Sequence, residues 1–257
     1  ATIPVITKLT PNVHSVVPTG RSVVKAGSNG LSLINTIQSV TGVDLDSFVP
    51  NPYVGGKSVF GGYCGPAVKP IALKMLTTIA QDDLTSKVPI SGIGGVSTWK
   101  DAVEFMLLGA SNVQVCTAAM HHGFRIVEDM AEGLNNWMNE KGFKKLTDFI
   151  GKSVPTVTHW EDLDINYHHV AQINQEKCIH CGLCYIACED TSHQSINLEK
   201  GMPYNTYTIK EEECVGCNLC QLVCPVDNCI TMEERRVAPE YINWVEWQKR
   251  GLPLNDH

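Results

Sequence analysis

The 257-residue chain has no apolar run close to the roughly 18 residues that a membrane-spanning helix needs. Its first residues, ATIPVITKLTPN, lack the basic segment and the long apolar core of a secretory signal peptide. Lysine and arginine number 20 against 27 aspartate and glutamate, so the net charge of −7 offers no basic surface to nucleic acid. These absences argue against membrane, secreted and nucleic-acid-binding proteins, and we expect a cytoplasmic protein.

A dinucleotide fingerprint is also missing. The nearest run, GIGGVS, does not have the G-x-G-x-x-G spacing that binds a pyrophosphate at the start of a helix. We therefore expect any nicotinamide cofactor to bind outside this chain.

Cysteine, in contrast, is abundant. The chain has 11 cysteines, which is many for a cytosolic protein whose thiols stay reduced, and most of them lie between positions 178 and 229. Two runs share the spacing C-x2-C-x2-C-x3-C, and each cysteine of the second run follows its counterpart by 36 residues. The runs are Cys178, Cys181, Cys184 and Cys188, then Cys214, Cys217, Cys220 and Cys224. This internal duplication predicts a helix and a short strand in each half.

The spacing is typical of a domain that holds two [4Fe–4S] clusters. Three cysteines in a tight loop bind three corners of a cubane, and the fourth cysteine of that run binds the other cluster. The expected ligand sets are therefore Cys178, Cys181, Cys184 and Cys224 for one cluster, and Cys214, Cys217, Cys220 and Cys188 for the other. Gly182 and Gly216 are expected to let backbone amides approach the sulfurs.

The alternative metal is zinc, but structural zinc sites use four ligands, usually in two separated pairs, which the repeated triplet does not match. Cys224 is followed by proline, as in bacterial ferredoxins, whereas Cys188 is followed by Glu189. Cys229 lies outside the repeated spacing and is expected to be buried without binding a cluster.

The first 150 residues have a different pattern, in which apolar runs alternate with helical stretches. The predicted strands cover 5–9, 30–35, 89–93 and 112–117, and the predicted helices cover 15–27, 66–81, 97–109 and 122–140. Such βα units form a parallel sheet, and four of them are half of an eight-fold (β/α)8 barrel. Half a barrel exposes two sheet edges, so we expect either another chain to complete it or the sequence to be a fragment of a longer protein.

Polar residues follow each predicted strand, at the edge where a barrel carries its chemistry. They are Lys8, then Asn35 and Thr36, then Gly94 and Gly95, then Cys116 and Thr117. If these are the last four strands of a barrel, the third and fourth ends form its phosphate-binding loops, and the helix after Gly94 and Gly95 adds a favourable dipole. The loop 40–65, rich in glycine, is long enough to be functional.

These segments, in the order PVITKLTPN, SLINT, GGYCGPAVKPIAL, PISGIGG and NVQVCTAAM, resemble the flavin-binding barrel of the dihydropyrimidine dehydrogenases. The cysteine domain follows in the same order and resembles two-cluster bacterial ferredoxins. The implied domains are a C-terminal half barrel at 1–151, a linker at 152–171, a ferredoxin-like α+β domain at 172–235 and a tail at 236–257.

The resemblance also implies roles for individual residues. Lys8 would lie by the ring of FMN and stabilise its reduced, negatively charged form. Asn35 would read the pyrimidine, because an amide both donates and accepts hydrogen bonds, and Thr36 would contact flavin and substrate. Gly65 would contact FMN from the long loop. Five residues would hold the FMN phosphate: Ile93, Gly94, Gly95, Cys116 and Thr117.

By the same resemblance, the cysteine that protonates the pyrimidine lies on a loop upstream of these residues, and Cys64 is a weak substitute. No catalytic acid is therefore assigned in this chain. A partner flavoprotein subunit would take hydride from NADH at its FAD. Electrons would then pass through the clusters to FMN and reduce the 5,6 double bond of uracil or thymine. An oligomer is expected.

Three other functions stay open. The first is a dihydroorotate-type dehydrogenase with a fused ferredoxin domain. The second is an electron carrier whose half barrel serves only as a docking platform, and the third is a zinc-stabilised interaction module.

Overall fold

The computed structural model describes residues 2–191, 193–236 and 242–251. The chain divides into two compact units, Ala1–Thr158 and His159–His257. Within the tail predicted at 236–257, residues 242–251 are described and the others, except 236, lie outside the described residues.

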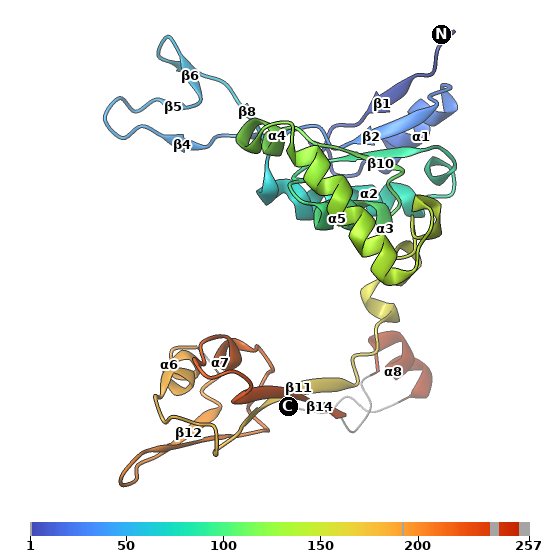
Figure 1. The fold of residues 1–257 in the computed structure, drawn as a ribbon. Coiled ribbons are helices and arrows are strands. Elements are labelled where there is room, and N and C mark those ends of the chain that lie inside the picture. The colour runs from blue at the N-terminus through green and yellow to red at the C-terminus, as the bar shows by residue number, and fades with distance from the viewer. Residues whose placement is uncertain (1, 192, 237–241, 252–257) are drawn as a thin grey trace. The chain divides into compact units, whose positions relative to one another are not determined.

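The first unit is built on a parallel sheet with strand order β1-β2-β9-β10 (Figure 1). Its strands are β1 (Ile6–Lys8), β2 (Gly30–Leu33), β9 (Ile90–Ile93) and β10 (Asn112–Gln114). In the described part of the chain the sheet stays open, with β1 and β10 at its edges. The parallel βα arrangement predicted for half a barrel is therefore present.

The helices of the first unit connect these strands. They are α1 (Val17–Lys25), η1 (Pro66–Val68), α2 (Lys69–Gln81), η2 (Thr85–Lys87), α3 (Trp99–Leu107), α4 (Thr117–His122), α5 (Ile126–Lys141), η3 (Leu146–Asp148) and η4 (Val154–Thr156). Thr98 caps α3, because its hydroxyl accepts a hydrogen bond from the amide of Asp101.

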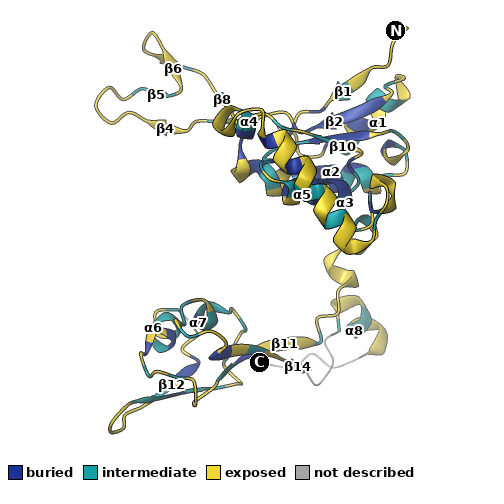
Figure 2. Ribbon diagram, viewed as in Figure 1, coloured by how far each residue is buried: buried dark blue, intermediate teal, exposed yellow. Residues whose placement is uncertain are grey.

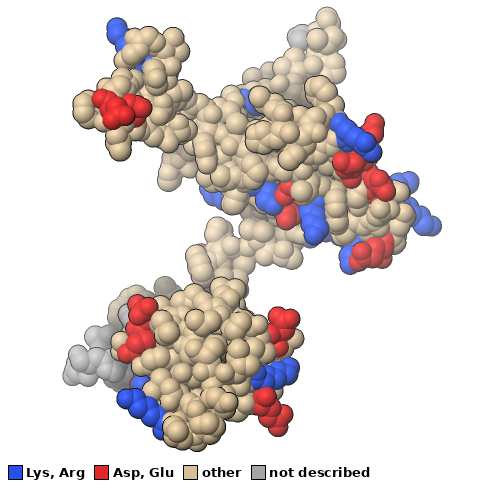
Figure 3. Space-filling view, turned by 60° about the vertical axis from the view of Figure 1, so that its left-hand side comes forward, with Lys and Arg blue, Asp and Glu red and all other residues tan. Residues whose placement is uncertain are grey.

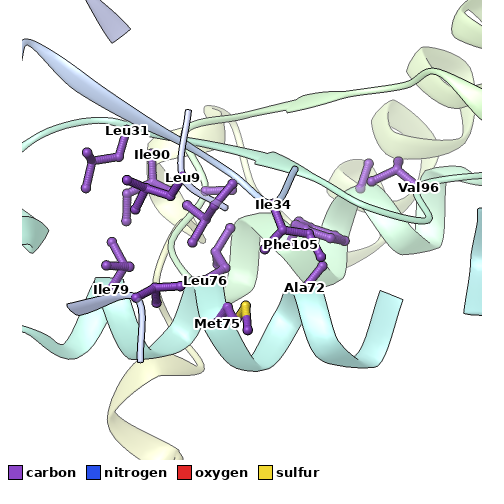
Figure 4. Close-up of a cluster of buried hydrophobic side chains, with 14 of the residues drawn as sticks. Leu9, Leu31, Ile34, Ala72, Met75, Leu76, Ile79, Ile90, Val96 and Phe105 are labelled. Atoms are coloured by element: carbon purple, nitrogen blue, oxygen red, sulfur yellow. The ribbon is translucent and has the colours of Figure 1, made fainter. Parts of the chain in front are cut away.

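The core lies between the sheet and helices α2 and α3 (Figures 2 and 4). Leu31 and Leu33 of β2 and Leu76, Ile79 and Phe105 of the helices are fully buried. Because successive side chains of a strand point to opposite faces, Ser32 between the two leucines faces away from this core. The helices thus hold the sheet from one side and leave the other face to polar groups.

Two predicted boundaries are wrong. Residues predicted as the end of the fourth strand are not in it: β10 ends at Gln114, and Thr117 begins α4. Residues 123–125 separate α4 from α5, so the predicted helix 122–140 starts later, at Ile126. The physical reason is Gly123, which ends α4 with a φ of +78°, a conformation that few other residues adopt.

The long loop between the second strand and α2 is not structureless. It contains three antiparallel pairs: β3 (Ile37–Ser39) with β8 (Gly61–Tyr63), β4 (Gly42–Val43) with β5 (Pro50–Asn51), and β6 (Tyr53–Val54) with β7 (Lys57–Ser58). In Figure 1 this arm extends away from the parallel sheet.

The second unit consists of two antiparallel strand pairs and short helices. Its elements are η5 (Trp160–Asp162), β11 (Tyr167–Ile173), α6 (Leu183–Glu189), β12 (Ile196–Glu199), β13 (Thr206–Ile209), α7 (Leu219–Leu222), β14 (Ile230–Arg236) and α8 (Trp244–Arg250). β11 pairs with β14 and β12 with β13. Each half of the duplication therefore contributes a helix that begins within its cysteine run and a strand that follows the run, as predicted for a ferredoxin-like α+β domain.

Two further observations concern the surface and the helices. On the face shown in Figure 3, acidic and basic side chains are interspersed. Among the described residues, no helix is long and apolar enough to cross a membrane.

Candidate functional site

A cavity opens at the carboxyl end of the parallel sheet. All nine flavin- and substrate-site residues predicted from the sequence line it: Lys8, Asn35, Thr36, Gly65, Ile93, Gly94, Gly95, Cys116 and Thr117. They meet because the strands are parallel and in register, with Leu33 beside Gly92 and Ile93 beside Gln114. The strands thus all end at the same edge of the sheet.

Three glycines let the backbone form the wall of this cavity. Gly65, Gly94 and Gly95 have φ angles of +91°, +133° and +78°, a region that favours glycine. A Cβ on Gly95 would lie 2.8 Å from the carbonyl oxygen of Gly65 and 2.9 Å from Cβ of Lys69. The two loops are therefore packed so closely that only glycine fits between them.

The loops offer the donors that a phosphate needs. Within the described residues, the amides of Gly94, Gly95, Cys116 and Thr117 donate to no protein acceptor. Converging backbone amides are a general means of binding phosphate. The donor set and the glycine-lined wall fit the phosphate of FMN.

The start of α3 contributes less than the sequence predicts. The carboxylate of Asp101 accepts hydrogen bonds from the amides of Ser97 and Thr98, at 2.9 and 2.8 Å. Since its own side chain takes up these donors, the expected dipole contribution from this helix is largely offset.

Sequence reasoning missed Gln114, which also lines the cavity. Its Nε2 donates to the hydroxyls of Ser32 and Ser91, each at 2.8 Å, and so ties three neighbouring strands together. The alternation of side chains along each strand was the available signal, because it places these three polar residues on the face opposite the core.

Asn12 was missed as well, and it joins the loop after β1 to the loop that carries the substrate-site residues Asn35 and Thr36. Its Nδ2 donates to the carbonyl of Thr36 at 3.1 Å, and its Oδ1 accepts from the amide of Gln38 at 2.8 Å. Oδ1 of Asn35 accepts from the amide of Thr36 at 2.9 Å, which leaves the Asn35 Nδ2 as a donor. Asn12 therefore positions the loop that carries Asn35 and Thr36.

The second unit has two cavities lined by cysteine. Cys178, Cys181, Cys184 and Cys224 line the first, and Cys188, Cys214, Cys217 and Cys220 line the second. Each cavity thus combines three cysteines of one run with the fourth of the other. This crossing is the arrangement that the two-cluster spacing predicts.

The chemistry of these cavities fits iron–sulfur clusters. Burial raises the pKa of the Cys184 thiol and of the Cys220 thiol to about 11, so protonated thiols are favoured until a metal displaces the proton. Among the described side chains, no three His, Cys, Asp or Glu converge on a point that one metal ion could occupy. Four cysteines line each cavity as the predicted ligand set, and four thiolates are what a [4Fe–4S] cubane binds.

Backbone amides reach two of the sulfurs. The amide of His180 lies 3.4 Å from Sγ of Cys178, and that of Ser195 lies 3.2 Å from Sγ of Cys188. Gly182 instead permits close packing, since a Cβ there would lie 2.7 Å from Oη of Tyr207. Gly182 and Gly216 were expected to let amides approach the sulfurs, and for these two glycines that stays a prediction.

Cys229 is buried, as expected, but it lines the first cysteine cavity. Burial, followed by the nearby Cys224 thiol, raises the pKa of the Cys229 thiol to about 11. Its Sγ lies 3.6 Å from the carbonyl oxygen of Asn174.

Comparison with known proteins places these two sites in context. The family model described as dihydroorotate dehydrogenase matches residues 1–138, and the one described as 4Fe-4S dicluster domain matches residues 171–232. The NAD-dependent dihydropyrimidine dehydrogenase subunit PreA of Escherichia coli (strain K12) is 42% identical over 196 residues, which are 76% of this chain and 48% of the relative.

Two further relatives match the chain. The chloroplastic dihydropyrimidine dehydrogenase (NADP(+)) of Arabidopsis thaliana is 41% identical over 166 residues, 63% of this chain and 39% of the relative. The catalytic subunit of dihydroorotate dehydrogenase B (NAD(+)) of Pyrococcus furiosus is 44% identical over 150 residues, 58% of this chain and 47% of the relative. The chain spans about half the length of these curated relatives or less. It belongs to the dihydroorotate dehydrogenase family and carries a 4Fe-4S dicluster domain behind its barrel segment.

Proposed function

We propose that the protein reduces the 5,6 double bond of uracil or thymine, with FMN and the pyrimidine bound in the barrel cavity and two [4Fe–4S] clusters in the cysteine cavities. The observation that carries this proposal is the convergence of all nine predicted residues on one cavity. The match of the chain to the dihydropyrimidine dehydrogenase subunit of Escherichia coli supports a pyrimidine as the substrate class.

Bound FMN would supply hydride chemistry and the clusters single-electron transfer. The side chains of the chain would do the positioning. Lys8 is exposed at the end of β1 and forms no ion pair within the described residues, so its ammonium group is available to negative charge in the cavity. Asn35 would bind the pyrimidine through its Nδ2, and Asn12 would hold the loop in place.

The loops that end β9 and β10 would hold the phosphate. Gly94, Gly95, Cys116 and Thr117 would donate backbone hydrogen bonds, with the Cys116 thiol taking no part as a nucleophile. The proton for the pyrimidine would come from a residue outside the nine. Cys64 lines the cavity, and its Sγ accepts a hydrogen bond of 3.4 Å from the Thr117 hydroxyl.

Electrons would enter through a partner. We propose that a subunit carrying FAD binds NADH and passes electrons to the clusters of this protein in a cytoplasmic oligomer. The relative from Escherichia coli is itself named a subunit, which supports a multi-subunit enzyme.

The test is an anaerobic assay of the protein that carries this chain, with and without its co-purified flavoprotein. NADH-dependent loss of uracil absorbance should need both proteins, and iron, sulfide and FMN should be present in the protein with this chain. If the protein with this chain oxidised NADH by itself, that result would contradict the proposal that a partner subunit is needed. If metal analysis found zinc in place of iron, that result would contradict the proposal that the cysteine cavities hold [4Fe–4S] clusters.

A second candidate is dihydroorotate oxidation, which the match to the Pyrococcus furiosus catalytic subunit favours. Turnover of dihydroorotate or orotate, with no turnover of uracil or thymine, would establish it instead.

A further inference from the structure

The two cysteine cavities are related by the internal duplication, so differences between equivalent positions stand out. The residue after the second cysteine of each run is Gly182 in the first and Asn218 in the second. Both have a positive φ, +76° and +65°, and both precede the helix of their half. The backbone is thus the same, and the side chain is what differs.

A second pair of equivalent positions explains why the second half can carry a side chain at Asn218 whereas the first half has Gly182. A Cβ on Gly182 would lie 2.7 Å from Oη of Tyr207, which is buried and lines the first cavity. The position 36 residues before Tyr207 is Ala171, which is buried and lines the second cavity. By the duplication, the small alanine stands in the second cavity where the tyrosine ring stands in the first, and Asn218 lines the second cavity as well.

The side chain of Asn218 lacks a partner in the protein. Its Oδ1 is buried and, among the described residues, is the one buried side-chain oxygen or nitrogen without a hydrogen bond. Buried polar atoms are nearly always satisfied, and an exception calls for a partner that the protein itself does not supply. Asn218 also lines the cavity formed by Cys188, Cys214, Cys217 and Cys220.

We propose that the side-chain amide of Asn218 donates a hydrogen bond from Nδ2 to a sulfur of the cluster held by these four cysteines. The two ends of an amide have nearly the same shape, so a half-turn about χ2 exchanges the buried Oδ1 for Nδ2. A cubane and its thiolates carry acceptor sulfurs and no donors, so the amide nitrogen is the end that can pair with them. Asn218 is a positioning and tuning residue, since a hydrogen bond to sulfur stabilises the reduced, more negative cluster.

This inference rests on the proposed function, because it needs the second cavity to hold a cluster. Iron and sulfide analysis and two separable EPR signals from the reduced wild-type holoprotein test the clusters first. If either is missing, the proposed function fails. If both are present, the variants below test Asn218 alone.

The variant is Asn218→Gly, which keeps a residue suited to positive φ and reproduces the first half of the duplication. The matched control is Asn228→Gly, because Asn228 also has a positive φ, +54°, but is exposed and lines neither cavity. In an EPR-monitored redox titration of the holoprotein, Asn218→Gly should lower the ratio of reduced to oxidised second cluster about three- to tenfold at a fixed potential, the size expected for one lost hydrogen bond. The first cluster should not shift.

Pulsed EPR provides a readout that does not depend on how well the variant assembles its cluster. In reduced holoprotein labelled with 15N at asparagine side chains, the second cluster should show a 15N coupling. Asn228→Gly should retain that coupling, and Asn218→Asp, which keeps the shape but lacks Nδ2, should lose it. Equal potentials in the two glycine variants, or the absence of this coupling from the wild type, would overturn the inference.

Discussion

The ammonium group of Lys69 lies 2.6 Å from Oδ1 of Asp101, an ion pair that joins α2 to α3 directly behind the glycine loop of the barrel cavity. Asp101 is nearly buried and also accepts hydrogen bonds from the amides of Ser97 and Thr98. Lys69 reaches a second carboxylate, that of Glu104, at 2.8 Å. This small network fixes the position of the loop that carries Gly94 and Gly95.

Replacing Asp101 with asparagine should therefore destabilise the first unit by about 1–2 kcal/mol, because asparagine keeps an oxygen for the amides of Ser97 and Thr98 but loses the charge that pairs with Lys69. The free energy of unfolding can be measured by urea titration at pH 7. Glu140→Gln is the control, because Glu140 pairs with Lys141 at the surface and its loss should change stability by less than about 0.5 kcal/mol. Equal effects of the two variants would contradict the assigned role.

The same residue predicts a dependence on pH. Burial alone raises the pKa of Asp101, but hydrogen bonds from Lys69, Ser97 and Thr98 outweigh it and hold the pKa below the ordinary 3.8. A carboxylate with a lowered pKa stabilises the fold above its ordinary pKa, and this contribution is lost as the pH falls through the folded pKa. The stability difference between wild type and Asp101→Asn should be constant near neutral pH and shrink below about pH 3.8. Thermal unfolding of cluster-free protein across this range measures it, and a difference that grows in acid would contradict the assignment.

Gly95→Ala should abolish flavin binding, because the added Cβ would press on the Gly65 carbonyl within the phosphate loops. The control is Gly142→Ala, whose φ of +75° is close to the +78° of Gly95 but whose Cβ would meet no atom within 4 Å. Both variants carry the cost of an alanine at positive φ, about 1 kcal/mol or somewhat more. Only Gly95→Ala should lose bound flavin, measured by absorbance after reconstitution, and retention of flavin there would argue against the phosphate site.

Lys8→Met should make the bound flavin harder to reduce. The loss of a partly exposed positive charge near the ring would lower the ratio of reduced to oxidised flavin about tenfold at a fixed potential. Lys57→Met in the extended arm, outside the cavity, serves as the control. A redox titration of the flavin band that finds the same potential in both variants would remove Lys8 from the site.

The crossing of the two cysteine runs predicts which cluster each variant loses. Cys188→Ala should remove the signal of the cluster held by the second run, and Cys224→Ala that of the cluster held by the first, because each cysteine lines the cavity of the other run. EPR of the reduced protein distinguishes the two signals. Cys64→Ala in the first unit should leave both unchanged. Loss of the cluster bound by the same run would contradict the crossing.

Local sequence patterns predicted much of the fold and many of the candidate site residues. The duplicated cysteine spacing predicted which thiols share a cavity, because the repeat is visible in the sequence and two-cluster domains combine three cysteines of one run with the fourth of the other. The alternation of apolar runs with helical stretches predicted the parallel sheet, and the order of the strands then placed Lys8, Asn35, Gly94 and Cys116 at one edge. Parallel strands in register leave little freedom at that edge.

Other features depend on contacts between distant segments. Gln114 reaches Ser32, and Asn12 reaches Thr36 and Gln38, through hydrogen bonds that no local pattern specifies. The carboxylate of Asp101 accepts hydrogen bonds from the amides of Ser97 and Thr98, at the helix start whose dipole was expected to favour a phosphate. Ala171 of β11 and Asn218 before α7 are far apart in the sequence and line the same cavity. The sequence indicated which residues are candidates for binding cofactors, because the cysteine spacing and the polar residues after each predicted strand can be read directly from it. Only the tertiary structure decided which polar groups remain unpaired and available, because that depends on every neighbour the folded chain brings into reach.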